Sequence, residues 1–106
     1  MSAAEAKRKL VGFLEERAFR PVLRADPGKY AENQREKLKY VQRRTETEIE
    51  RFHNYGSASE VVTNFRRDLN SEPAKKVHRD LSDLGLPTLN DVRLEFEKLA
   101  DELGLS

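Results

Sequence analysis

Residues 30–56 read YAENQREKLKYVQRRTETEIERFHNYG, a stretch that contains no proline and no glycine before Gly56. We expect one long helix over about residues 28–55, because Asp26 and Pro27 together are typical of a helix start and nothing interrupts the segment that follows. Gly56 is predicted to end this helix in the left-handed conformation. Roughly 26 residues at the standard helical rise make a rod of about 39 Å.

The apolar residues of this long helix recur at helical spacing but form a narrow stripe. Gln34 and Thr45 interrupt it where an apolar residue is expected. A compact domain of this size has a radius of gyration of about 13 Å, so the interrupted stripe favours a helix that projects beyond the others. We therefore predict that the stripe binds protein, and in particular a second copy of the chain as a homodimer. Its residues are Tyr30, Leu38, Val41, Ile49 and Phe52.

Hydroxyl and carboxylate pairs mark the starts of two further helices. Ser2 with Glu5, and Ser57 with Glu60, have the spacing of a capping box, in which each side chain satisfies a free amide of the first turn. The helix that begins at Ser2 is predicted to end at Pro21, because proline lacks the amide hydrogen and the space to continue it.

Three shorter helices are expected after the long one, at about residues 57–69, 74–84 and 88–103. Gly85 is predicted to take the left-handed conformation that closes the second of them. The last helix is expected to begin at Thr88 or Asn90. If Asn90 is the cap, Leu89 and Leu94 occupy the two positions of a hydrophobic staple. The helical spacing continues up to Gly104.

No segment alternates polar and apolar residues with the period of a strand, so the predicted class is all-α. We expect a small five-helix bundle in a single domain, residues 1–106. Within it, residues 1–56 are predicted to form a helical hairpin with a long arm, and residues 57–106 a compact three-helix part. Leu, Ile, Val and Phe make up about a quarter of the chain, which suffices for a thin core.

The composition argues against several classes of function. The chain has no cysteine and two histidines, which excludes a disulfide framework, a thiolate nucleophile and a structural zinc built from this chain alone. It also lacks the glycine-rich and Gly-flanked serine motifs of common enzymes, so we expect no catalytic activity and no cofactor. The net charge is +1, and no apolar run approaches the length of a secretory signal or a membrane span. We therefore expect a cytoplasmic protein.

Charge is unevenly distributed along the chain. Residues 1–44 hold 12 basic and 6 acidic side chains, whereas residues 91–102 hold 2 basic and 5 acidic ones. Lys7 to Lys9 beside apolar residues would also suit a helix on an anionic membrane, but Glu15 and Glu16 dilute that attraction. The asymmetry favours contacts between helices, within or between chains, and no membrane partner is expected.

Glu50 and His53 have the Glu-x-x-His spacing of di-iron carboxylate bundles, and Glu46 lies one turn before them. Such a site requires two of these motifs and two further carboxylates, and this chain has one motif. The pattern therefore favours a solvated pair beside the core. Metal binding through a dimer stays open as an alternative.

The competing function is a small helix-turn-helix-like DNA-binding regulator, because cations gather around the turn between the third and fourth predicted helices. Acidic residues alternate with these cations and would repel phosphates, so protein is the favoured partner and nucleic acid the alternative. No small-molecule ligand is evident from the sequence. The candidate nucleic-acid-binding residues are Arg66, Arg67, Lys75, Lys76 and Arg79.

Overall fold

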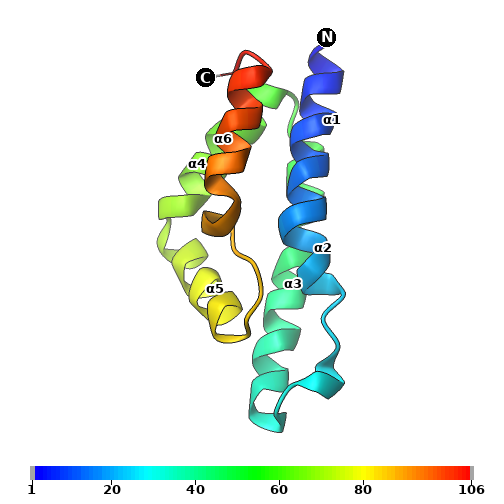
Figure 1. The fold of residues 1–106 in the computed structure, drawn as a ribbon, viewed down its shortest axis with the longest axis vertical. Helices are drawn as coiled ribbons and strands as arrows, with labels where there is room; N and C mark the ends of the chain where they lie inside the picture. Colours follow the sequence, from blue (N-terminus) through cyan, green and yellow to red (C-terminus); the bar gives the residue numbers. More distant parts are fainter. Residues whose placement is uncertain (1, 106) are drawn as a thin grey trace.

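The structure, a computed structural model, describes residues 2–105, and these form helices and connecting segments without a β-strand. The predicted all-α bundle is confirmed. Figure 1 shows the N-terminal helices running antiparallel to one another along one side of the molecule and the C-terminal helices on the other side. The α-helices are α1 (Ala3–Leu14), α2 (Arg20–Leu23), α3 (Glu32–Asn54), α4 (Ala58–Asn70), α5 (Glu72–Asp83) and α6 (Arg93–Glu102).

The first predicted helix does not end at Pro21. A π-helical turn, Glu15–Phe19, joins α1 to α2, and helical structure continues to Leu23. The Arg20 amide bonds to the Glu15 carbonyl five residues back, so Pro21 lies in the first turn of α2. A proline is tolerated there because a first-turn amide has no partner within the helix to lose.

The long helix begins later than predicted. Pro27–Lys29 forms a separate 3-10 turn, in which the Asp26 carboxylate accepts a hydrogen bond of 2.9 Å from the Gly28 amide. Tyr30 is extended, and α3 starts only at Glu32. The Asp-Pro-Gly segment is thus a turn of its own and not the first turn of the long helix.

The prediction that Gly56 takes the left-handed conformation is wrong. Within residues 2–105, positive φ angles occur at Gly85 and Gly104, at 71° and 77°. Tyr55 ends α3 in an extended conformation, and the Gly56 amide donates to the Glu60 carboxylate at 2.9 Å. The next helix therefore supplies the hydrogen-bond acceptor at this junction, and the prediction for Gly85 is confirmed.

Of the two expected starts of the last helix, the structure shows Thr88 and not Asn90. Thr88 and Asp91 exchange hydrogen bonds, with the Thr88 amide donating to the carboxylate and the Asp91 amide donating to the hydroxyl. Thr88 is therefore the cap, and a 3-10 turn, Asn90–Val92, leads into α6. The prediction of a hydrophobic staple is wrong, because its two side chains do not pack together: Leu89 is buried, whereas Leu94 is 74% exposed.

Two separate hydrophobic cores hold the bundle together. The first core lies among α1, the C-terminal end of α3, α4 and α6, and the second core lies among α2, α3 and α5. The molecule is elongated, with extents of 47 × 22 × 20 Å. Residues 2–56 and residues 57–105 both contribute to each core. Fully buried side chains include Leu10, Phe52, Phe65 and Phe96 in the first core and Leu38 and Val41 in the second.

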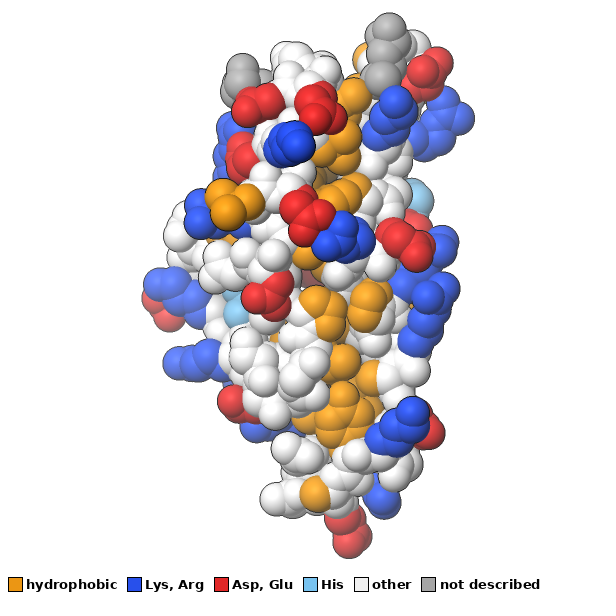
Figure 2. Space-filling view, in the orientation of Figure 1, with side chains coloured by type: hydrophobic (Ala, Val, Ile, Leu, Met, Phe, Trp, Pro, Cys, Tyr) orange, Lys and Arg blue, Asp and Glu red, His pale blue; other side chains and the backbone are white. Residues whose placement is uncertain are grey.

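Apolar side chains reach the surface along the seam between the two sides of the bundle. Figure 2 shows them as a band that follows the long axis, with Lys, Arg, Asp and Glu side chains on both flanks. Half-buried residues that pack against the cores include Phe13 and Leu99 for the first core and Leu86 for the second. Among residues 2–105, no helix combines the length and the apolar character that crossing a membrane requires.

Candidate functional site

The predicted protein-binding stripe lies inside the chain. Leu38, Val41 and Phe52 are completely buried, and Ile49 packs against the first core. The Tyr30 ring packs against the second core, where its hydroxyl donates to the Leu84 carbonyl at 3.0 Å. The chain's own helices cover this stripe along the length of α3, so the structure corrects the expectation that it faces a second copy. Self-association itself stays a prediction.

Most of the candidate nucleic-acid-binding cations are paired with carboxylates. Arg66 donates two hydrogen bonds to Glu97 on α6, at 2.8 and 2.7 Å, and the bonds lower the pKa of Glu97. A single residue, Ser71, separates α4 from α5, which is shorter than the connection of a helix-turn-helix. Nucleic-acid binding stays an untested alternative. Other pairs are Arg67 with Asp68, Lys75 with Glu72 and Lys76 with Asp80, while Arg79 is exposed.

Glu46, Glu50 and His53 are all exposed on α3. The His53 ring pairs with Glu15 of the π-helical turn, so the helix beside α3 holds it. Within residues 2–105, no group of three or more His, Asp or Glu side chains is placed to share a metal ion.

A cleft of about 400 Å³ lies where the two cores meet, and we call it the central cleft. Its walls come from the π-helical turn, α2, α3, the end of α4, α5 and the segment before α6. Its volume lies within the range of about 300–1,000 Å³ that is usual for small-molecule sites. Apolar side chains line much of it, including Phe19, Val22, Val77, Leu81 and Leu89.

Thr45 explains why the cleft opens at this level. It occupies the position in the apolar stripe of α3 between Val41, in the second core, and Ile49, against the first. It is buried and lines the cleft. A small polar side chain there replaces the large apolar one that would join the two cores. The interruption of the stripe at Thr45 was visible in the sequence, but it did not reveal that a cavity would lie beside it.

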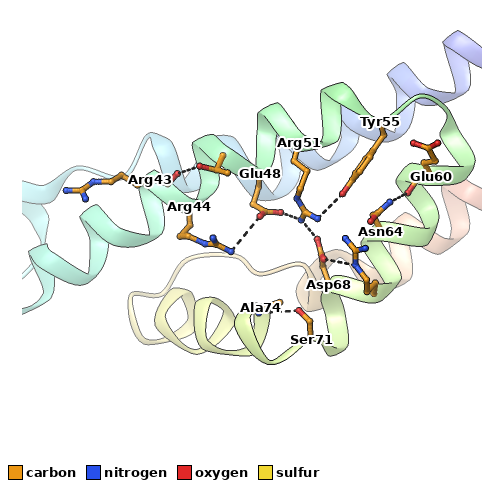
Figure 3. Close-up of polar contacts among 12 residues, drawn as sticks. Arg43, Arg44, Glu48, Arg51, Tyr55, Glu60, Asn64, Asp68, Ser71 and Ala74 are labelled. Atoms are coloured by element: carbon orange, nitrogen blue, oxygen red, sulfur yellow. Dashed lines mark hydrogen bonds and ion pairs between the residues drawn. The ribbon is translucent and has the colours of Figure 1, made fainter.

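The polar wall of the cleft is organised around Arg51. Figure 3 shows its guanidinium group directed towards Asp68 at the end of α4, with Glu48 and Tyr55 along α3 beside it. Arg51 donates hydrogen bonds to both carboxylates and, at 2.8 Å, to the Tyr55 hydroxyl. It also lies 5.2 Å from the centroid of the Phe52 ring, within the range of a cation–π contact.

Two further arginines extend this arrangement at its ends. Arg44 lies 3.9 Å from Glu48, and Arg67 lies 3.8 Å from Asp68. We call these five residues the arginine network: Arg44, Glu48, Arg51, Asp68 and Arg67. Three guanidinium groups share two carboxylates, so the network carries one excess positive charge. Arg44 and Glu48 are four residues apart on α3, but Arg51 and Asp68 lie on different helices, so no local sequence pattern indicates the network.

The local environment moves three pKa values in directions that matter for chemistry in the cleft. Burial alone would lower the pKa of Arg51, but hydrogen bonds to Asp68 and Glu48 outweigh it, and the net direction is upward. Burial raises the pKa of Tyr55. Burial also lowers the pKa of His78, although Asp68 and other carboxylates oppose that effect. At neutral pH Arg51 therefore stays ionised and the His78 imidazole stays neutral.

Comparison with known protein families, with curated proteins and with solved structures found no match for this chain. The interpretation of the central cleft therefore depends on its geometry and charge.

Proposed function

We propose that the protein is a non-enzymatic binding protein that holds a small molecule in the central cleft. The observation that carries this proposal is the coincidence of a cleft of about 400 Å³ with a half-buried arginine network. An apolar pocket with a few convergent polar groups is the usual form of a small-molecule site.

Burying the charges of the arginine network costs free energy, which supports a role for the network other than stabilising the fold. Replacing buried ion pairs by apolar residues of similar volume is often neutral or stabilising. In addition, the Nε–H groups of Arg44 and Arg51 are buried and donate to no acceptor among residues 2–105. Buried donors without a partner are rare and destabilising. Such unpaired donors are expected beside a cleft whose charged groups bind a ligand.

The charges of the cleft suit binding better than catalysis. A general acid or base works best with a pKa near the working pH. Glu48 and Asp68 both accept hydrogen bonds from Arg51, so both carboxylates of the cleft are already engaged by a guanidinium group. The imidazole of His78 makes no hydrogen bond to a side chain within the described part of the chain. The cleft thus presents fixed charges and no paired acid and base.

The experiment is a screen of a small-molecule fragment library against the full chain by nuclear magnetic resonance. We expect the amide shifts caused by hits to cluster around Thr45, Asp68 and Val77. Ala74→Phe, which adds a ring inside the cleft, should abolish these shifts, whereas Ala4→Phe on an exposed face of α1 should leave them unchanged. Hits that map elsewhere, or that survive Ala74→Phe in a folded protein, would overturn the proposal.

A second candidate is self-association through the apolar band along the seam of the bundle, visible in Figure 2. This band, and not the buried stripe of α3, is the surface that would meet another copy of the chain. Light scattering at micromolar concentration is the test. We expect twice the chain mass of 12.3 kDa, and a monomer under these conditions would remove this candidate.

A further inference from the structure

We propose that the molecule held in the central cleft is an amphipathic organic anion, with one acidic head group at Arg44 and an apolar body among the side chains of α2 and α5. This inference rests on the proposed function, because it names the chemical class of the ligand for the same cleft.

The end members of the arginine network lie within ion-pair distance of a carboxylate, but their terminal N–H groups make no hydrogen bond to it. Arg51 is committed to Glu48, Asp68 and Tyr55. The separations at Arg44 and Arg67, 3.9 and 3.8 Å, exceed the length of a hydrogen bond. Their terminal N–H groups can therefore donate to an anion. Among residues 2–105, the cleft lining offers no further carboxylate to balance the network's excess positive charge.

Of the two end members, Arg44 is better placed to anchor a head group. Its side chain is 41% exposed, against 62% for Arg67, so less of its interaction with an anion is screened by water. Arg44 also directly precedes Thr45 on α3, at the level where the cleft opens. The Ser71 hydroxyl accepts a hydrogen bond from the Ala74 amide and keeps its own O–H to donate.

The rest of the cleft suits an apolar body. Val22 and Leu81 are buried members of the second core, and Phe19 and Leu89 belong to the first, so the space between them is bounded by hydrocarbon on both sides. Burying apolar ligand surface there is favourable because it removes that surface from water. A polyanion would leave charges in this apolar part, and a cation would face the excess arginine charge.

Three probes with the same apolar chain and different head groups test the proposal: octanoate, octanol and octylamine. Calorimetric titration of the full chain at neutral pH and low salt should show binding of octanoate, about tenfold weaker binding of octanol and none of octylamine. Tenfold is the ratio expected for the loss of one charge-assisted hydrogen bond. The changes in amide chemical shift that octanoate causes should cluster around Thr45 and Val77.

Variants of two adjacent arginines separate specific binding from a general charge effect. Arg44→Gln should weaken octanoate binding about tenfold and leave octanol binding unchanged, while Arg44→Lys should keep most of the affinity. Arg43→Gln is the matched control, because Arg43 is exposed, lies one residue away on α3 and does not line the cleft. Circular dichroism checks that each variant is folded.

The outcomes distinguish the two proposals. Equal affinities for octanoate and octanol, with no effect of Arg44→Gln, would overturn the anionic ligand and leave small-molecule binding in the cleft intact. An equal loss of octanoate binding in Arg43→Gln and Arg44→Gln would also overturn it. If neither probe nor any library fragment binds in the cleft, both proposals fail.

Discussion

Arg51 on α3 donates a hydrogen bond to Asp68 on α4, and the pair joins the two helices at the edge of the central cleft. Asp68 is only 8% exposed although it carries a charge. A carboxylate buried to this degree requires a partner, because removing a charge from water is expensive. The pair therefore fixes α4 against α3 at the level where the two cores separate.

Asp68→Asn should lower the free energy of unfolding by about 1–3 kcal/mol, because it removes a charge-assisted hydrogen bond and leaves Glu48 as the one carboxylate bonded to Arg51. Chemical denaturation measures the change. Asp83→Asn is the control, since Asp83 pairs with Lys37 at 3.2 Å on the surface and should cost at most about 1 kcal/mol. Similar losses in the two variants would contradict a special role for Asp68.

Acidification should destabilise the protein partly through His78. Burial lowers the pKa of His78 from its ordinary value of 6.5, so below that pH the unfolded chain takes up a proton that the folded chain does not. The free energy of unfolding should therefore fall as the pH drops from about 7 to 5. In His78→Gln this part of the fall should be absent, as measured by denaturation at a series of pH values.

His53→Gln is the matched control for this pH series. His53 is the other histidine of the chain, and it lies exposed and pairs with Glu15. The part of the acid destabilisation that comes from His78 should persist in this variant. If His78→Gln shows the same pH dependence as the unmodified protein, burial does not lower the pKa of His78 in the folded state.

Truncation of Phe65 should be the most damaging change in the first core. Its ring stacks on Phe96 with centroids 3.9 Å apart and an interplanar angle of 16°, and both side chains are fully buried. Phe65→Ala should lower the free energy of unfolding by about 3–5 kcal/mol. Leu94→Ala, at an exposed site on the same α6 helix that carries Phe96, should change it by at most about 0.5 kcal/mol.

Two glycine-to-alanine substitutions should act with opposite signs. Gly12 lies inside α1 and Gly85 has a φ of 71°, and an added Cβ meets no atom within 4 Å at either position. Gly12→Ala should stabilise by about 0.5–1 kcal/mol and Gly85→Ala should destabilise by about 1–2 kcal/mol, both from backbone conformation alone. Thermal unfolding measures both, and changes of the same sign would contradict this explanation.

Two helix caps and one helix end were predicted correctly from the sequence. Ser2 and Ser57 cap helices as predicted, with each hydroxyl accepting a hydrogen bond from the amide three residues on, and Gly85 is left-handed. Errors arose where a neighbouring segment decides the local geometry. Pro21 is accommodated by a π-helical turn before it, and Gly56 by the carboxylate of the following helix.

The site was less predictable than the helices. Arg44 and Glu48 have the spacing of four residues that favours an ion pair along a helix, and they lie 3.9 Å apart. No local pattern, however, indicates that Asp68 meets Arg51 17 positions away in the sequence. The structure also places His78 half-buried in the wall of the cleft, a position that no local pattern indicates.

The sequence by itself determined the all-helical class, the caps of α1 and α4, and which face of each helix is apolar, because these depend on residues within a few positions of one another. Only the tertiary structure decided what covers those faces. It placed the stripe of α3 against the chain's own helices, and it left the central cleft beside Thr45 where the two cores do not merge. The physical reason is that burial depends on which helices become neighbours, and periodicity within one helix does not contain that information.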